Sequence, residues 1–189
     1  MTTEEVFSML DARGIKGMMF HQQMADYFDF LNLRGYKRLH EYRFLSESAE
    51  LRGLHRYYIN HYNRLIPQRD PGDPKAIPDS WYRYSRQDVG PADKKKFILS
   101  AFHDWVEWET ETKKIYEDAW NALCSNKDYA AVNKISKCLA DVDMELKKAT
   151  RMCITLKDVD ADLDYVLTVQ DGLHDEYDEK CKHIGVEFC

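Results

Sequence analysis

The sequence contains few residues that interrupt helices. Its 189 residues include only 8 glycines and 5 prolines, while 44% are hydrophobic and 32% are charged. So little glycine and proline excludes a collagen-like chain, and the apolar content excludes a disordered one. The balance is typical of helices that each carry one apolar stripe and one solvated face. At this length we expect a single domain over residues 1–189.

The chain also lacks features that several classes of protein require. It has no excess of positive charge, since the formal net charge is -6, whereas nucleic acids and anionic membranes attract basic surfaces. No apolar run reaches the roughly 18 residues of a membrane span, and the N-terminus lacks the layout of a signal peptide. The 5 cysteines include no Cys-x-x-Cys pair, which indicates a reducing compartment. We therefore expect a soluble, cytoplasmic protein that binds neither nucleic acid nor membranes.

Proline is confined to one part of the chain. The prolines are Pro67, Pro71, Pro74, Pro78 and Pro91. Because proline removes a backbone donor and disfavours helix before it, residues 66–92 are expected to form an extended crossover. At about 3.3 Å per residue, such a segment can run the length of a long helix and let the next helix start at the same end. This predicts an all-α four-helix bundle with one long crossover between its second and third helices.

Apolar residues at spacings of three and four predict the helices on both sides of the crossover. The bundle helices are expected at residues 17–31, 36–65, 92–124 and 129–156. A shorter fifth helix is expected at residues 158–185, and residues 1–14 are expected to form an N-terminal extension.

Polar residues interrupt these apolar stripes. His21 lies in the first stripe, His55 in the second and Glu109 in the third, while Glu145 lies at the edge of the fourth. A charged group in a bundle core costs several kcal/mol unless it is paired or bound to a metal ion. Two interpretations follow. The carboxylates and histidine bind non-haem iron or manganese, or Arg52 pairs with the glutamates in a metal-free polar network.

The second helix carries a family resemblance. The stretch RFLSESAELRGLHRYYINHYNRL resembles the second helix of non-haem ferritins, in which Phe-Phe, polar residues and Glu-Glu precede Glu-x-x-His and a later tyrosine. The residues that fall into this pattern are Phe44, Leu45, Glu47, Glu50, His55 and Tyr62. The stretch WVEWETETKKIYEDAW is similar to the third ferritin helix, with Glu109 at the position of its metal-binding glutamate.

The rest of the chain extends this resemblance. SNKDYAAVNKISKCLADVDMELKKATRMCITL resembles the turn and fourth helix of ferritins, where Asp128, Tyr129 and Asn133 match and Glu145 falls on the final ligand position. The last helix is similar to the short fifth ferritin helix. The resemblance implies a ferritin-like homo-oligomer that binds, oxidises and stores non-haem iron. Ferroxidase-type oxidoreductase activity is implied only if the centre is functional.

Two positions depart from the ferritin pattern. Arg52 stands where a glutamate is expected, and Gln22 stands where the first helix would supply a bridging glutamate. A register shift in the first helix would bring His21 or Asp26 inward instead. The candidate metal ligands are therefore His55, Glu109, Glu145, Gln22, Glu50 and His21.

Two outcomes stay open for this centre. One is a rebuilt site for a single iron ion, because a tight two-iron centre needs more carboxylates than this set supplies. The other is a metal-free, shell-forming ferritin relative in which the guanidinium of Arg52 occupies the space of a metal ion and forks to Glu109 and Glu145. The stretch LNLRGYKRLHE also resembles the first turn of the DNA-protecting mini-ferritins. This resemblance is narrower, and we rank it below the resemblance to non-haem ferritins.

Overall fold

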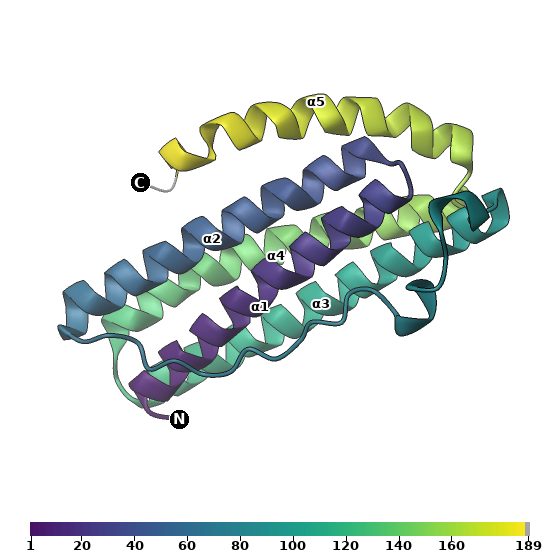
Figure 1. Cartoon of the computed structure of the whole chain (residues 1–189). Coiled ribbons are helices and arrows are strands. Elements are labelled where there is room, and N and C mark those ends of the chain that lie inside the picture. Colours follow the sequence, from purple (N-terminus) through teal and green to yellow (C-terminus); the bar gives the residue numbers. More distant parts are fainter. Residues whose placement is uncertain (188–189) are drawn as a thin grey trace.

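The chain forms five helices, and its described residues contain no strand (Figure 1). The computed structural model describes residues 1–187, apart from the side chains of Ser80 and of residues 184–187. The helices are α1 Thr3–Phe30, α2 Arg34–Tyr62, α3 Pro91–Ser125, α4 Tyr129–Asp158 and α5 Leu163–Glu187. Helices α1 to α4 form the bundle, so the prediction of an all-α four-helix bundle with a crossover between its second and third helices is confirmed.

The crossover runs along the bundle from the end of α2 to the start of α3 (Figure 1). It includes two short 3-10 helices, η1 Asp79–Trp81 and η2 Arg86–Asp88. Trp81 stacks on Tyr27 of α1 with ring centroids 4.6 Å apart, which fixes the segment to the bundle. Pro91 begins α3, at a position where the missing backbone donor costs nothing.

Helix α1 begins earlier than its apolar pattern predicts. The Thr2 hydroxyl accepts a hydrogen bond from the Glu5 amide at 3.2 Å, and the Glu5 carboxylate accepts one from the Thr2 amide at 2.8 Å. This reciprocal cap satisfies two backbone donors at the helix start. Val6 and Phe7 follow it and are fully buried. The prediction of an N-terminal extension over residues 1–14 is therefore wrong, because these residues pack as the first turns of α1.

The buried apolar side chains form two clusters. The larger one contains Phe28 and Trp105, and the other contains Phe7 and Leu123. Between them, the middle turns of the four bundle helices carry charged and polar side chains around a cavity. We call this region the polar layer, and it holds the candidate site.

Helix α5 lies along the outside of α2 (Figure 1). The two helices approach closely, since a side-chain carbon added at Gly35 of α2 would lie 1.9 Å from the carbonyl oxygen of Gln170 in α5. Arg38 Nη2 also lies 2.8 Å from Asp178 Oδ1. Helix α2 is thus covered on two sides, by the bundle and by α5.

Replacing Gly35 by alanine is expected to displace α5 from α2. The added methyl group would overlap a backbone oxygen, so the helices must separate locally, at a cost of about 1 to 3 kcal/mol. Hydrogen exchange read by mass spectrometry should show faster exchange in α5 and unchanged exchange in α1 and α3. The matched control is Gly53→Ala, whose added carbon would meet only Lys134 Nζ at 3.9 Å. Equal exchange in both variants would contradict the assigned packing.

Candidate metal centre

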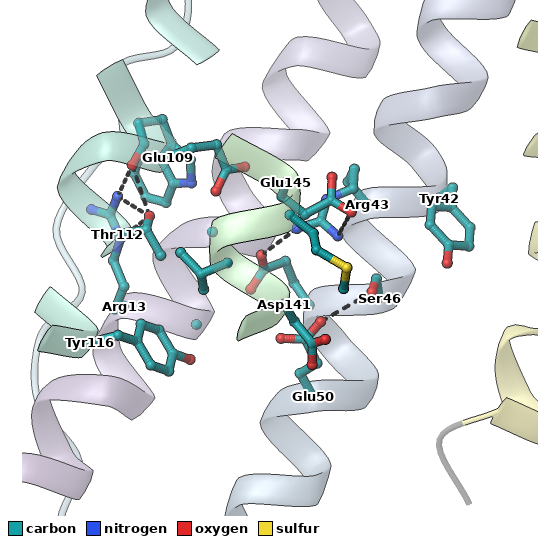
Figure 2. A pocket seen from close by; sticks show the side chains of 16 residues that line it. Arg13, Tyr42, Arg43, Ser46, Glu50, Glu109, Thr112, Tyr116, Asp141 and Glu145 are labelled. Atoms are coloured by element: carbon teal, nitrogen blue, oxygen red, sulfur yellow. Dashed lines mark hydrogen bonds and ion pairs between the residues drawn. The ribbon is translucent and has the colours of Figure 1, made fainter. Parts of the chain in front are cut away.

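A cavity of about 180 Å³ lies in the polar layer (Figure 2). All four bundle helices contribute to its lining, and five of the lining side chains are carboxylates. These are Glu47 and Glu50 of α2, Glu109 of α3, and Asp141 and Glu145 of α4. We call this the carboxylate pocket. So many acidic groups around one cavity need positive charge close by, because an unpaired buried carboxylate is costly.

Arg43 of α2 supplies positive charge at the centre of the carboxylate pocket (Figure 2). Its Nη1 lies 3.2 Å from Glu145 Oε1 on α4, and its Nη2 lies 3.5 Å from Glu47 Oε1 one turn along α2. Burial disfavours the charged guanidinium, but the surrounding glutamates outweigh this and raise the pKa of Arg43 above its ordinary value. Arg43 therefore stays charged.

Arg13 of α1 lies at the wall of the pocket, and each of its three guanidinium nitrogens donates a hydrogen bond. Its guanidinium stacks over the Trp108 ring at 3.4 Å and donates to the Trp108 carbonyl at 2.8 Å. It also donates from Nη1 to Glu111 at 2.9 Å and from Nε to Thr112 at 3.0 Å. The carboxylate that Arg13 contacts directly, Glu111, is not among the five of the pocket, but the charge of Arg13 also acts on Glu47 and Glu109.

Three of the pocket carboxylates, Glu47, Glu50 and Glu109, hold protons more tightly than exposed ones do. Burial raises the pKa of Glu47 to about 8, with a further contribution from the charge of Glu50. Burial also raises the pKa of Glu50 and of Glu109. One guanidinium therefore does not balance the acidic groups of the pocket at neutral pH, and part of the balance is made by bound protons.

Two buried histidines adjoin the pocket. The Nδ1 atoms of His21 and His40 lie 3.0 Å apart, so one ring donates a hydrogen bond to the other. His21 Nε2 lies 3.9 Å from Glu109 Oε1. Burial lowers the pKa of His40 to about 3 and that of His21 well below its ordinary value, so both rings are neutral.

Helix α1 presents glycines where it faces the pocket. A side-chain carbon at Gly17 would lie 3.1 Å from Glu47 Oε2, and one at Gly14 would lie 3.1 Å from Leu51 Cδ1. Both glycines line the cavity. The space that a side chain at either of these two glycines would fill is therefore taken by side chains of α2.

Comparisons with known proteins give matches in structure. No protein-family model and no curated protein matches the sequence. A solved humanized archaeal ferritin aligns with a TM-score of 0.75 and 20% identity over 91% of this chain and 94% of that chain. The open-pore ferritin of Archaeoglobus fulgidus and a form of that ferritin engineered to be closed each align with a TM-score of 0.74 and 17% identity, again over 91% of this chain and 94% of theirs. The fold is ferritin-like.

The ferritin-like bundle brings only some of the predicted ligands together. Glu50, Glu109 and Glu145 line the carboxylate pocket, and His21 lies beside it. Gln22 does not, because it is exposed on α1.

His55 also lies outside the pocket lining. Its Nε2 is 2.5 Å from Asp11 Oδ1, and its side chain is 41% exposed. The turn of α2 that faces the pocket is the earlier Glu47 to Glu50 turn.

Arg52 is exposed on α2, so the prediction that its guanidinium forks to Glu109 and Glu145 is wrong. Arg43 takes the internal position instead. Arg43 and Arg52 are nine positions apart in the sequence. This is two and a half turns of an α-helix, so the two side chains lie on opposite sides of α2. The alternative of a metal-free ferritin relative, in which Arg52 takes the place of the metal ion, is therefore not supported by the position of Arg52.

The sequence pattern missed Arg13, Arg43 and His40. All three are buried polar residues, and each lies on a helix at spacings of three or four from pocket residues or core aromatics. The pair Arg43 and Glu47, one turn apart, was the available signal, because a buried cation needs a nearby anion.

The donor atoms of the carboxylate pocket are of the type that a hard divalent metal ion binds, although no three of them lie within 4.8 Å of one another in the described residues. Carboxylate oxygens and one imidazole are the ligands that Fe(II) and Mn(II) prefer in proteins. Glu145 Oε2 and His21 Nε2 are buried and find no hydrogen-bond partner within the described part of the chain. These two atoms are therefore available as ligands, although the pocket carboxylates are spread around Arg43 in this structure.

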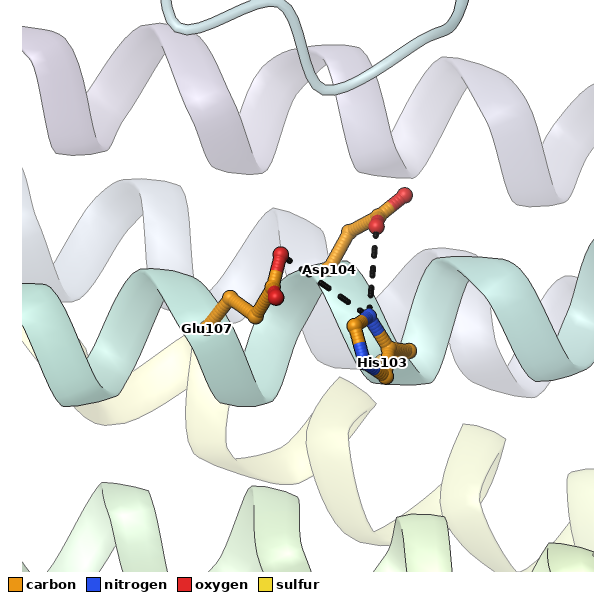
Figure 3. A group of neighbouring side chains, drawn as sticks. All are labelled: His103, Asp104 and Glu107. Atoms are coloured by element: carbon orange, nitrogen blue, oxygen red, sulfur yellow. Dashed lines mark ion pairs between the residues drawn. The ribbon is translucent and has the colours of Figure 1, made fainter.

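A tighter group of metal-type ligands lies on the surface (Figure 3). The ligand atoms of His103, Asp104 and Glu107 all lie within 4.8 Å of one another, and no other group of three among the side chains that the structure describes is so close. These residues are on α3 outside the bundle core, and the side chains of His103 and Glu107 are mostly exposed. Exposed acidic groups of this kind are common without a metal ion, so we assign no site there.

Replacing His40 by phenylalanine is expected to make the protein more resistant to acid. The folded-state pKa of about 3 lies below the ordinary value of 6.5, so His40 stabilises the fold above pH 6.5 and this contribution is lost as the pH falls toward 3. Between about pH 7 and about pH 4 the free energy of unfolding of the wild-type protein should fall by about 3 kcal/mol because of His40. The phenylalanine variant lacks this contribution to the fall. Urea unfolding at both pH values measures this, with the exposed His103→Gln as control. Parallel pH profiles for all three proteins would contradict it.

Proposed function

We propose that this ferritin-like chain binds iron in its carboxylate pocket. The observation that carries the proposal is the buried Glu145 Oε2, which faces the cavity without a hydrogen-bond donor in the described residues. A buried carboxylate oxygen without a donor is costly unless a cation satisfies it. A metal ion would meet this requirement.

The ligands we propose are Glu47, Glu109 and Glu145, with His21 beside Glu109. They come from four different helices, and oxygen donors with one imidazole suit non-haem iron. Since Arg43 already compensates part of the charge, we propose a single ion per chain rather than a two-iron centre. His21 is kept because it lies 3.9 Å from Glu109 of the pocket. His55 and Gln22 are left out of this set because neither lines the cavity, and their contacts are with Asp11 and Asp26 outside it.

Iron oxidation and storage by a homo-oligomer of this chain form the second part of the proposal. Several large apolar side chains are exposed on the bundle surface, such as Met144 and Ile154 of α4, and an assembly would cover them. No helix in the described chain is long and apolar enough to cross a membrane. Four of the cysteines are free thiols, which fits the reducing cytoplasm that we propose as the location. Light scattering gives the particle mass directly.

Anaerobic titration with Fe(II) tests the proposal. We expect saturable binding of about one ion per chain, weakened at least about tenfold by Glu109→Gln or Glu145→Gln, because each change removes a charged ligand. Glu107→Gln is the matched control, since it removes a carboxylate from the exposed group on α3 instead. Admission of air should then give a ferric product in the wild-type protein. Absence of saturable Fe(II) binding, or loss of binding only in the Glu107 variant, would refute the assignment.

A further inference from the structure

Arg43 is held in the carboxylate pocket by unusually loose contacts. Its two shortest approaches to carboxylate oxygens are 3.2 Å to Glu145 and 3.5 Å to Glu47. A charge-assisted hydrogen bond between such groups is ordinarily about 2.7 to 2.9 Å long. Arg43 Nε is buried and has no hydrogen-bond partner within the described chain, although the side chain is only 7% exposed. The guanidinium thus compensates charge of the pocket carboxylates without making all the hydrogen bonds that it could donate.

Arg43 is also the cation that the pocket glutamates share. The glutamates Glu47, Glu50, Glu109 and Glu145 all interact electrostatically with it. Arg13 is committed to Glu111, Thr112 and the ring of Trp108. A metal ion that enters the pocket must therefore approach the same oxygens that face the guanidinium.

We propose that Arg43 is a tethered cation that competes with the metal ion for the carboxylates of the pocket, and so sets how tightly the pocket binds metal. Two cations in one buried cavity repel each other, because the low dielectric leaves their charges poorly screened. The metal ion gains Glu47 and Glu145 as ligands only when the guanidinium gives them up. This inference rests on the proposed iron site, but its test separates the two.

The test compares Co(II) binding to the metal-free wild-type protein, Arg43→Met and Arg52→Met by calorimetry and by ligand-field absorption. Methionine matches the length of the arginine stem and removes its charge. We expect Arg43→Met to bind Co(II) at least about tenfold more tightly than wild type. Arg52→Met removes an exposed arginine from the same helix and should leave the affinity unchanged.

The outcomes distinguish the inference from the proposed function. Equal affinities in wild type and Arg43→Met overturn the inference and leave the iron site standing. Binding to Arg43→Met alone supports the inference and overturns the proposed function of the wild-type chain. Absence of binding to both proteins overturns both.

A variant that fails to fold without metal is also informative. Arg43→Gln, which keeps polar donors but no charge, is measured in parallel. If neither neutral variant folds alone, addition of Co(II) during refolding should restore the helical circular dichroism, because the ion replaces the missing charge. Failure of Co(II) to restore it overturns the inference.

Discussion

Replacing Arg43 by methionine is expected to lower the free energy of unfolding of the metal-free protein by about 3 to 5 kcal/mol at about pH 8. The change leaves the pocket glutamates without the cation that they share, and removal of one partner of a buried ion pair exposes the other to the full cost of burial. The loss should shrink toward about pH 5, since Glu47, with a pKa of about 8, is then protonated. Urea unfolding in the presence of a chelator measures it.

Arg52→Met provides the control for this prediction. Arg52 lies on the same helix but is exposed, so its replacement should change stability by less than about 0.5 kcal/mol. The sequence alone favours the opposite ranking of the two arginines. A larger loss from Arg52→Met than from Arg43→Met would contradict the assigned pocket.

Replacing Glu47 by glutamine is expected to remove a large part of the dependence of stability on pH. The folded-state pKa of about 8 lies above the ordinary value of 4.5, so protonated Glu47 stabilises the fold. That contribution is complete below about pH 4.5 and is lost as the pH rises through 8. Glutamine does not titrate and keeps an oxygen that can accept from Arg43. Between about pH 5 and about pH 8.5 the wild-type protein should lose about 4 kcal/mol that the variant retains.

Urea unfolding of both proteins across this range, without metal, checks the prediction. The control is Glu107→Gln, which changes a side chain that is 70% exposed and should leave the profile parallel to that of the wild-type protein. If the Glu47→Gln profile also ran parallel to wild type, the raised pKa of Glu47 would be disproved.

The helical fold could be predicted from the sequence because two signals agree. The clustered prolines mark the crossover, and the stripe of α3 that contains Trp105, Glu109 and Thr112 is buried as its spacing predicts. Helix α3 is buried on one face only. The apolar residues in its sequence therefore mark the face that packs against the bundle core. Glu109 was placed correctly in the polar layer for this reason.

The face of α2 could not be predicted in the same way. His55 is expected from the apolar stripe of this helix to face the bundle core, but Arg43 and Glu47 line the cavity instead. Helix α5 covers α2 from outside, so α2 carries apolar residues on two sides. Its apolar pattern in the sequence therefore does not identify the side that faces the bundle core. The resemblance to Glu-x-x-His then pointed to His55, one and a half turns away from the pocket-facing Glu50.

The start of α1 was missed for a different reason. Residues 1–14 are expected from the sequence to form an N-terminal extension, yet Thr2 and Glu5 form the cap of a long helix. Capping residues must be polar because they bond to free backbone groups. Polar composition at a chain end therefore does not separate a tail from a capped helix.

We propose that iron binds in the carboxylate pocket and not at a surface group. Crystals equilibrated with Fe(II) without oxygen, and measured on both sides of the iron absorption edge, test it most directly. We expect an anomalous peak in the cavity between Glu47, Glu109 and Glu145. A peak only at His103, Asp104 and Glu107 on the exposed side of α3, or no peak at all, would contradict it.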